Sequence, residues 1–460
     1  MVGLMAWHGR ATPGQPHGKQ VLLLLLALGS MLTAPTAQAE QLEPPDLPAE
    51  ASSTCPRQWP TRIGELEVTG LWRTELFIVQ NELPWRPGEL VTEAAWKLGL
   101  ARLWNLGLFS RVDGQLHCDG GDVRAQLSLE ERWTLNPLFS FQVLVRGDAK
   151  PGESSTWWTV GASELNLLGR HLEIAGQYSE FNGLPGGLAF GRLYNLGGLR
   201  LDALLQAELL VRPRPGFNDR RALLRTDLAR QWHDDRLRLG LRLDVLSDTF
   251  HDVGDGSSVL PGAAKTALLD MGLRVGRVDV VRVRQFGQSL EVRPGVALTH
   301  QEGHNDLQVH GQLWLQGLAY FAPGERWNLA LRLQAAAQTE APAHLQWFIG
   351  GLYEVRGVRD SYARTSAYAL LNAEARWTLY DATWLAVIPT AYLDAAVLRD
   401  VQRGPLLLAS TGAGVRLLVP RFVRTGLRFD LAQPLADMPC GSRATGGICP
   451  GLSLGVFQYF

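Results

Sequence analysis

The segment RLRLGLRLDVLSD, residues 236–248, alternates apolar and polar side chains almost throughout. Its apolar face holds Leu237, Leu239, Leu241, Leu243 and Val245, and its other face holds Arg238, Gly240, Arg242 and Asp244. A soluble β-sandwich also alternates, but its strands need only about 5–6 residues. A tilted strand that crosses a bilayer needs about 9–11 residues, and this segment is that long. It therefore predicts a barrel strand with leucines towards lipid and arginines towards a wet interior.

Similar segments fill the chain after residue 136. VRTGLRFDL, residues 423–431, repeats the pattern, with Leu427, Phe429 and Leu431 against Arg428 and Asp430. The expected strands are 138–147, 155–166, 169–179, 186–194, 198–211, 220–232, 235–248, 264–280, 287–299, 306–321, 326–338, 365–379, 383–397, 405–419, 422–433 and 451–460. Sixteen is an even number, as is the rule for bacterial outer-membrane barrels. We expect a mainly β protein with a sixteen-stranded transmembrane antiparallel barrel over residues 136–460.

A smaller unit precedes this barrel. Residues 61–135 read as strand, helix, helix, strand and strand, which indicates a small α+β domain. Residues 40–60 carry five prolines and predict an extended linker. Residues 1–39 contain basic Arg10 and Lys19, an apolar run from Val21 to Leu28 and a small-residue site at Ala37–Ala39. This pattern is typical of a secretory signal peptide, because the apolar run is shorter than the roughly 20 residues that a membrane anchor needs.

Composition restricts the function. With 460 residues, 46% hydrophobic residues and a net charge of −1, the chain resembles neither a disordered nor a nucleic-acid-binding protein. Four cysteines fit an oxidising compartment. Cys440 and Cys449 bracket a short Gly-rich loop and predict a disulfide, and Cys55 with Cys118 is a weaker prediction. A zinc site is the alternative, but the cysteine spacings match no zinc-finger pattern.

The segment FIGGLYEVRGVRD, residues 348–360, interrupts the alternation with glycines and an arginine. This segment and six others resemble the POTRA–barrel superfamily of outer-membrane assembly and translocation proteins. The six others are, in order along the chain, GELEVTG, NLGLFSRV, SELNLLGRHLEI, LNAEARW, AYLDAAV and LRFDLAQPL. This superfamily is the BamA, TamA and FhaC group, also described as bacterial surface antigens. The resemblance covers about residues 61–460 and implies that residues 61–135 are a single POTRA domain.

The resemblance also implies a role for the interrupted segment. In this family the loop folds back into the barrel, and its arginine meets an acidic residue on the inner wall. The corresponding motif here is Gly350, Gly351, Val355, Arg356 and Gly357. The period of two places Asp394 and Glu374 inside the barrel as partners of Arg356. A solvated loop arginine is the alternative, and Val358 departs from the aromatic residue that is common in the family.

Two functional classes follow from the resemblance. The first is a protein that inserts or translocates client proteins at the outer membrane, with the POTRA domain in the periplasm receiving unfolded or secreted clients by edge pairing. Dedicated secretion of one partner is the alternative within this class, and accessory periplasmic proteins and a lipid-handling role stay open. The second class is a passive pore or structural barrel, in which inward arginines would set a preference for anions.

Other sequence features are consistent with a transport protein. There is no G-x-S-x-G motif, and the glycines of GAGVRL, residues 412–417, lie in an alternating strand, so neither an enzyme nor a cofactor or metal site is expected. The last strand, about Gly451–Phe460, pairs with the first to close the barrel. Gly451 and Gly455 offer no side chain to this seam, and the resemblance implies that the seam opens sideways for clients.

Overall fold

The computed structural model of the chain describes residues 59–119, 122–144, 155–181, 183–214, 217–251, 263–281, 283–351, 353–358, 361–382, 384–420, 425–436 and 451–458. Residues 1–50 and 51–460 form separate compact units, and all the described residues belong to the second. The predicted signal peptide, the predicted linker as far as residue 58, and Cys55, Cys440, Cys449 and Phe460 lie outside the described residues. Cys118 takes part in a disulfide, while the pairing of the other cysteines stays a prediction.

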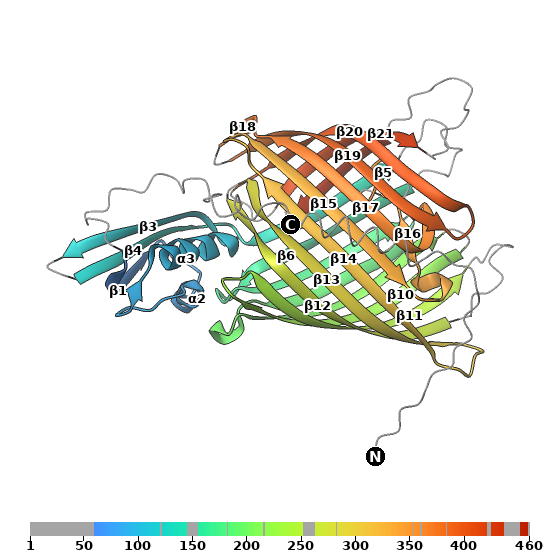
Figure 1. Ribbon diagram of the computed structural model, residues 1–460, viewed down its shortest axis with the longest axis horizontal. Helices are drawn as coiled ribbons and strands as arrows, with labels where there is room; N and C mark the ends of the chain where they lie inside the picture. Colours follow the sequence, from blue (N-terminus) through green and yellow to red (C-terminus); the bar gives the residue numbers. More distant parts are fainter. Residues whose placement is uncertain are drawn as a thin grey trace, which may run out of the picture. The chain divides into compact units, whose positions relative to one another are not determined.

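A small domain at the N-terminal side of the described chain combines one sheet with two helices (Figure 1). Its elements are β1 (Thr61–Thr69), α2 (Leu76–Glu82), β2 (Leu90–Val91), α3 (Glu93–Asn105), β3 (Phe109–Asp119) and β4 (Asp122–Glu131). The strand order is β2-β1-β4-β3, with β1 and β4 parallel. Helix α3 begins after Thr92, whose side chain accepts a hydrogen bond from the Ala95 amide at 3.2 Å. Ile63, Leu103 and Leu127 are fully buried and form the core of this domain.

The remaining strands close into a barrel. Its long strands are β5 (Leu135–Leu144), β6 (Ser155–Leu167), β7 (Leu172–Phe181), β8 (Leu184–Leu193), β9 (Leu201–Arg214), β10 (Phe217–Trp232), β11 (Leu237–His251), β12 (Ala263–Val281), β13 (Arg284–Gln301), β14 (Gln308–Phe321), β15 (Trp327–Gln338), β17 (Ala363–Trp377), β19 (Ala386–Asp400), β20 (Gly404–Leu418), β21 (Thr425–Ala436) and β22 (Gly451–Gln458). Each is hydrogen-bonded to its neighbours, and β22 lies beside β5. The described residues therefore contain sixteen long barrel strands, and the predicted fold class is confirmed.

Four short elements lie between the long strands. They are the 3-10 turns η1 (Leu196–Gly198) and η2 (Ala343–Leu345) and the strands β16 (Trp347–Ile349) and β18 (Tyr380–Asp381). Strand β16 pairs with β17 and β18 with β19, while β17 also pairs directly with β15 and β19. The two short strands thus extend the wall at its ends without changing the order of the long strands.

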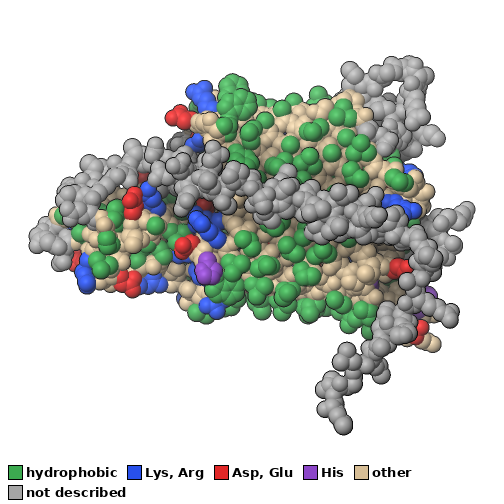
Figure 2. Space-filling view, in the orientation of Figure 1, with side chains coloured by type: hydrophobic (Ala, Val, Ile, Leu, Met, Phe, Trp, Pro, Cys, Tyr) green, Lys and Arg blue, Asp and Glu red, His purple; other side chains and the backbone are tan. Residues whose placement is uncertain are grey.

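The barrel exposes its apolar side chains outwards. In β11, Leu239, Leu241 and Leu243 are 43%, 51% and 43% exposed, whereas Asp244 and Asp248 are buried. The same side-chain alternation holds on neighbouring strands, and Figure 2 shows hydrophobic side chains spread over the outer surface of the strands. An apolar surface of this extent is the opposite of what a soluble barrel presents. None of the described helices has the length and apolar character needed to span a membrane.

Turns at one end of the barrel hold the small domain through charged and polar contacts. The Arg102 Nε on α3 donates to Asp235 Oδ2 at 3.0 Å, and the Asn105 amide donates to Asp279 Oδ1 at 2.8 Å. Arg200 forms ion pairs with both Glu82 on α2 and Asp235. Burial raises the pKa of Asp235, but the charges of Arg200 and Arg102 outweigh burial and hold that pKa below its ordinary value. These contacts place α3 against the barrel turns.

Candidate functional site: a loop anchored inside the barrel

The loop between β16 and β17 makes a tight turn at the predicted motif. Gly350, Gly351 and Gly357 have φ angles of 136°, 100° and 80°, in the region that favours glycine. The Gly351 amide donates to the Val358 carbonyl at 3.1 Å, and the Val358 amide donates to the Val355 carbonyl at 3.2 Å. A Cβ at residue 357 would lie 2.8 Å from the Cβ of Ala432 on β21. Gly357 therefore allows the loop to lie directly against the barrel wall.

Arg356 reaches from this loop to Asp394 on β19. Its Nε donates to Asp394 Oδ2 at 2.6 Å and its Nη2 donates to Oδ1 at 2.7 Å, which is the bidentate arrangement. The Arg356 amide donates to the same Oδ2 at 3.1 Å. Asp394 thus fixes both the side chain and the backbone of the loop at this residue.

A second carboxylate and an aromatic ring complete the contacts of Arg356. Its Nη1 donates to Glu374 Oε2 at 2.9 Å on β17. The guanidinium carbon lies 3.4 Å from the centroid of the Tyr392 ring, which is a cation–π contact. A Cβ at residue 412 would lie 2.5 Å from Cζ of Tyr392, so Gly412 makes room for this ring. The glycines of the GAGVRL segment therefore serve side-chain packing within the barrel.

Further charged groups surround the two carboxylates. Arg376 donates to Glu374 Oε1 at 2.9 Å, and Arg416 donates to Asp430 Oδ1 at 2.7 Å. Asn372 donates both to Asp394 Oδ1 at 2.8 Å and to the Glu354 carbonyl at 2.7 Å. The wall side chains therefore also contact the carboxylates that bind Arg356.

Burial makes this arrangement different from a surface ion pair. Arg356 is 3% exposed and Asp394 is fully buried. Burial alone would lower the pKa of Arg356, but the hydrogen bonds and charge of Asp394 raise it above its ordinary value. Removing one partner of a buried pair costs about 3–5 kcal/mol, because the other charge stays buried without compensation. Exposed pairs contribute only about 0–1 kcal/mol.

The apolar residues of the loop pack into a cluster of their own. Val355 and Val358 are 0% and 1% exposed. They contact a buried group that includes Tyr362, Tyr368 and Leu408. Val358, which stands where an aromatic residue is expected, is therefore buried within this cluster.

The structure brings Arg356, Asp394 and Glu374 together with the glycines of the motif, as the resemblance implies. Sequence reasoning missed Tyr392 and Arg416 as parts of this group, and it recognised Asp430 only as an inward residue. The period of two places Asp430 inside the barrel, but only the register between β17, β19, β20 and β21 brings it near Glu374. Of the predicted seam residues, Gly451 and Gly455 lie on β22 opposite Ala432 and Arg428 of β21.

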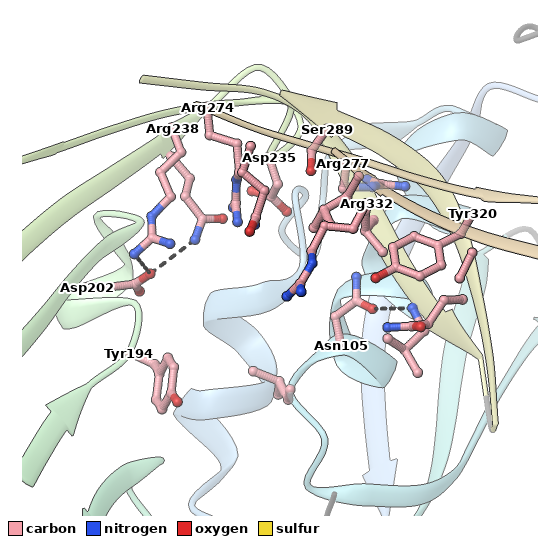
Figure 3. A pocket seen from close by; sticks show the side chains of 18 of the residues that line it. Asn105, Tyr194, Asp202, Asp235, Arg238, Arg274, Arg277, Ser289, Tyr320 and Arg332 are labelled. Carbon is pink, nitrogen blue, oxygen red and sulfur yellow. Dashed lines mark hydrogen bonds and ion pairs between the residues drawn. The ribbon is translucent and has the colours of Figure 1, made fainter. Parts of the chain in front are cut away.

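A cavity of about 720 Å³ lies beside the loop inside the barrel. The barrel wall contributes most of its lining, and Arg102, Asn105 and Leu106 contribute from α3 and the residue after it. Figure 3 shows Arg238, Arg274 and Arg332 extending from the wall into this space. Within the described part of the chain, no group of three or more His, Cys, Asp or Glu is arranged to hold a metal ion.

Comparison with known proteins identifies the fold. A scan against models of protein families and a search of curated proteins gave no match. Among solved structures, CdiB from Acinetobacter baumannii has a TM-score of 0.56 and 13% identity, over 87% of this chain and 74% of its own. CdiB from Escherichia coli has a TM-score of 0.56 and 14% identity, over 86% of this chain and 77% of its own. The chain shares its fold with CdiB.

BamA from Haemophilus ducreyi lacking POTRA domains 1–3 also aligns, with a TM-score of 0.49 and 14% identity, over 87% of this chain and 85% of its own. The likeness to CdiB confirms the predicted resemblance at the level of the fold. The POTRA assignment of the small domain stays a prediction, as does the functional role of the loop in this CdiB-like barrel.

Proposed function

We propose that this chain is a bacterial outer-membrane protein that inserts client proteins into that membrane or moves them across it. The small domain lies in the periplasm and receives clients, and the barrel guides them. The observation that carries this proposal is the anchored loop, in which Arg356 is held by Asp394 and Glu374 inside the barrel. A loop that fills part of the interior and is fixed by a buried bidentate pair restricts free passage, which supports a role other than an open pore.

The strand arrangement of the small domain supports the receiving role. Its sheet has the order β2-β1-β4-β3, so β3 is a long edge strand, whereas β2 at the other edge has two residues. An extended client segment could add to the backbone of β3 by strand pairing. Because strand pairing uses backbone hydrogen bonds, this edge would accept clients of varied sequence.

Dedicated secretion of a single partner is the second candidate, and the fold shared with CdiB is compatible with it. The two candidates differ in the number of proteins that depend on the chain. If the chain inserts proteins, its depletion should remove several proteins from the outer membrane. If it secretes one dedicated partner, its depletion should retain one secreted protein inside the cell.

Depletion of the chain in its own cells tests the proposal. Quantitative proteomics of the outer membrane, the periplasm and the medium should show one or more proteins missing from their destination. Wild-type protein and the Arg124→Ala variant should restore them, whereas Arg356→Ala should not. Arg124 is a matched control because its pair with Glu65 is exposed, with side chains 45% and 68% accessible. If depletion alters only the uptake of small solutes, the chain is a pore and the proposal is wrong.

A further inference from the structure

The cavity wall carries arginines that the anchored loop does not use. Thirteen arginines and five carboxylates line the cavity. Most of these arginines lie within 4.0 Å of a carboxylate, as Arg242 does with Asp227 at 3.2 Å. Two lining arginines, Arg274 and Arg332, have no carboxylate within 4.0 Å among the described residues, although Glu291 of β13 lies opposite Arg274 in the strand register. Their charges therefore need another explanation.

Arg274 differs from Arg332 in its hydrogen bonds. The Arg332 Nε donates to Asn372 Oδ1 at 2.9 Å, and its Nη2 donates to the Tyr353 carbonyl, so Arg332 holds the loop. The Arg274 Nε is buried and lacks a hydrogen-bond partner among the described residues. A buried donor without a partner costs about 1–3 kcal/mol, and more when it is charged. The site of Arg274 is therefore incomplete in the protein alone.

The strand register adds a second unfavourable feature at the same place. Arg238 on β11 lies directly opposite Arg274 on β12. Like charges at directly opposed positions destabilise an antiparallel pair. Arg238 has only a long contact of 3.8 Å to Asp202, whose Oδ2 already accepts from Gln231 at 3.1 Å. A small satellite cavity is lined by these two arginines together with Arg242, Arg293 and the carboxylates Asp227 and Glu291.

An anion between Arg238 and Arg274 would relieve the repulsion between their charges, because it supplies oxygen acceptors and a negative charge. We propose that Arg238 and Arg274 bind a small oxyanion, of the phosphate type, inside the barrel. Planar guanidinium groups suit such a ligand because each can donate two parallel hydrogen bonds to its oxygens.

The dimensions of the cavity favour a small ion over a polypeptide. Residues of helix α3 line one side of the cavity, and the loop residue Arg356 lines another. A volume of about 720 Å³ suits a small molecule. This site is independent of the proposed function, because a barrel that inserts proteins and a passive pore could each contain it.

Inorganic phosphate is the probe for the test, and the full chain folded in detergent is the sample. Calorimetric titration should give saturable binding of phosphate, and phosphate should raise the melting temperature more than chloride at the same ionic strength. Arg274→Gln and Arg238→Gln should each weaken phosphate binding about tenfold or more, because charged hydrogen bonds are lost. Arg274→Lys keeps the charge but not the two-pronged donor, so it should bind phosphate with intermediate affinity.

Arg192→Gln is the matched control, because it removes the same charge from the same cavity. Arg192 already donates to Tyr194 at 3.0 Å and lies 3.5 Å from Glu173, so its loss should leave phosphate binding unchanged. Equal stabilisation by phosphate and chloride, or wild-type phosphate affinity in Arg274→Gln, would overturn the proposal. So would binding of hexaglutamate without binding of phosphate, which would assign these arginines to acidic client segments.

Discussion

Arg356 shares its guanidinium between two carboxylates while its own amide also bonds to Asp394. The side chain therefore couples the position of the loop to the inner wall at one buried point. Because a guanidinium stays charged at any pH that a cell meets, only changes at the carboxylates or at the backbone of the loop can weaken this contact.

Arg356→Ala and Asp394→Asn should each destabilise the folded barrel by about 3–5 kcal/mol, because each leaves a buried charge or donor group without its partner. The double variant should be no less stable than either single variant, since the two changes remove one shared interaction. The temperature at which the folded band disappears from a gel measures the effect. Additive losses would mean that the two side chains do not interact, and Arg124→Ala at an exposed pair should change little.

His344 should make the stability of the folded protein depend on pH. Its ring is buried, lies 3.8 Å from Asp248 and 5.0 Å from the Phe250 ring, and burial lowers its pKa to about 4 despite the charge of Asp248. Histidine in the unfolded chain has its ordinary pKa of about 6.5. As the pH falls, the unfolded chain therefore binds a proton at His344 at a higher pH than the folded chain does. Stability is therefore full above about pH 6.5 and falls by up to about 3 kcal/mol as the pH drops towards 4.

Melting temperatures measured from pH 7.5 to pH 4.5 test this dependence on His344. His344→Gln should flatten the decline, because the variant has no imidazole to protonate. His233→Gln, in an exposed turn, should leave the decline as it is in the wild type. The same decline in His344→Gln as in the wild type would show that groups other than His344 bind the protons.

The loop 350–358 is the element whose conformation depends most on single residues. At Gly357, an added Cβ would have both an unfavourable φ and a contact of 2.8 Å with Ala432. Gly357→Ala should therefore lift the loop from the wall and expose the peptide bond after Arg356 to trypsin, with cleavage identified by mass spectrometry. Gly176→Ala on β7 is the control, since an added Cβ there meets nothing within 4 Å. A loop as resistant to trypsin as the wild type would contradict this account.

The long strands were predictable from sequence because one face of each meets an apolar environment. The period of two found all sixteen, although several ends differ; the first begins at Leu135 rather than 138, and the twelfth ends at Trp377 rather than 379. Strands β16 and β18 were missed because three and two residues are too few to show a period. Asp394 was predictable as a partner because the period and the family motif agree. Tyr392 was not, because its place under Arg356 depends on the space that Gly412 leaves on the neighbouring strand.

At the scale of the whole molecule, the seam between β5 and β22 decides whether the barrel can open sideways. Cysteines placed on both strands, one at Phe139 of β5 and one in turn at Leu452 or Leu454 of β22, should form a disulfide on oxidation where the two positions face each other. If the seam opens for clients, this lock should stop their insertion while the barrel stays folded. A cysteine pair at Leu224 and Val245, directly opposed on β10 and β11, should have no effect. Full activity with a locked seam would exclude lateral opening.

The same closure of the barrel has a consequence for the order of events during synthesis. The partner of β5, the first barrel strand, is β22, the last. A ribosome delivers β5 long before β22, so the edge of β5 waits without its partner until nearly all of the barrel has been made. Pairings between such distant parts of a chain form slowly, and an unpaired strand edge can aggregate in the meantime. We therefore expect the polypeptide to stay unfolded until β22 has been made, so that the two ends of the barrel can pair at the same time.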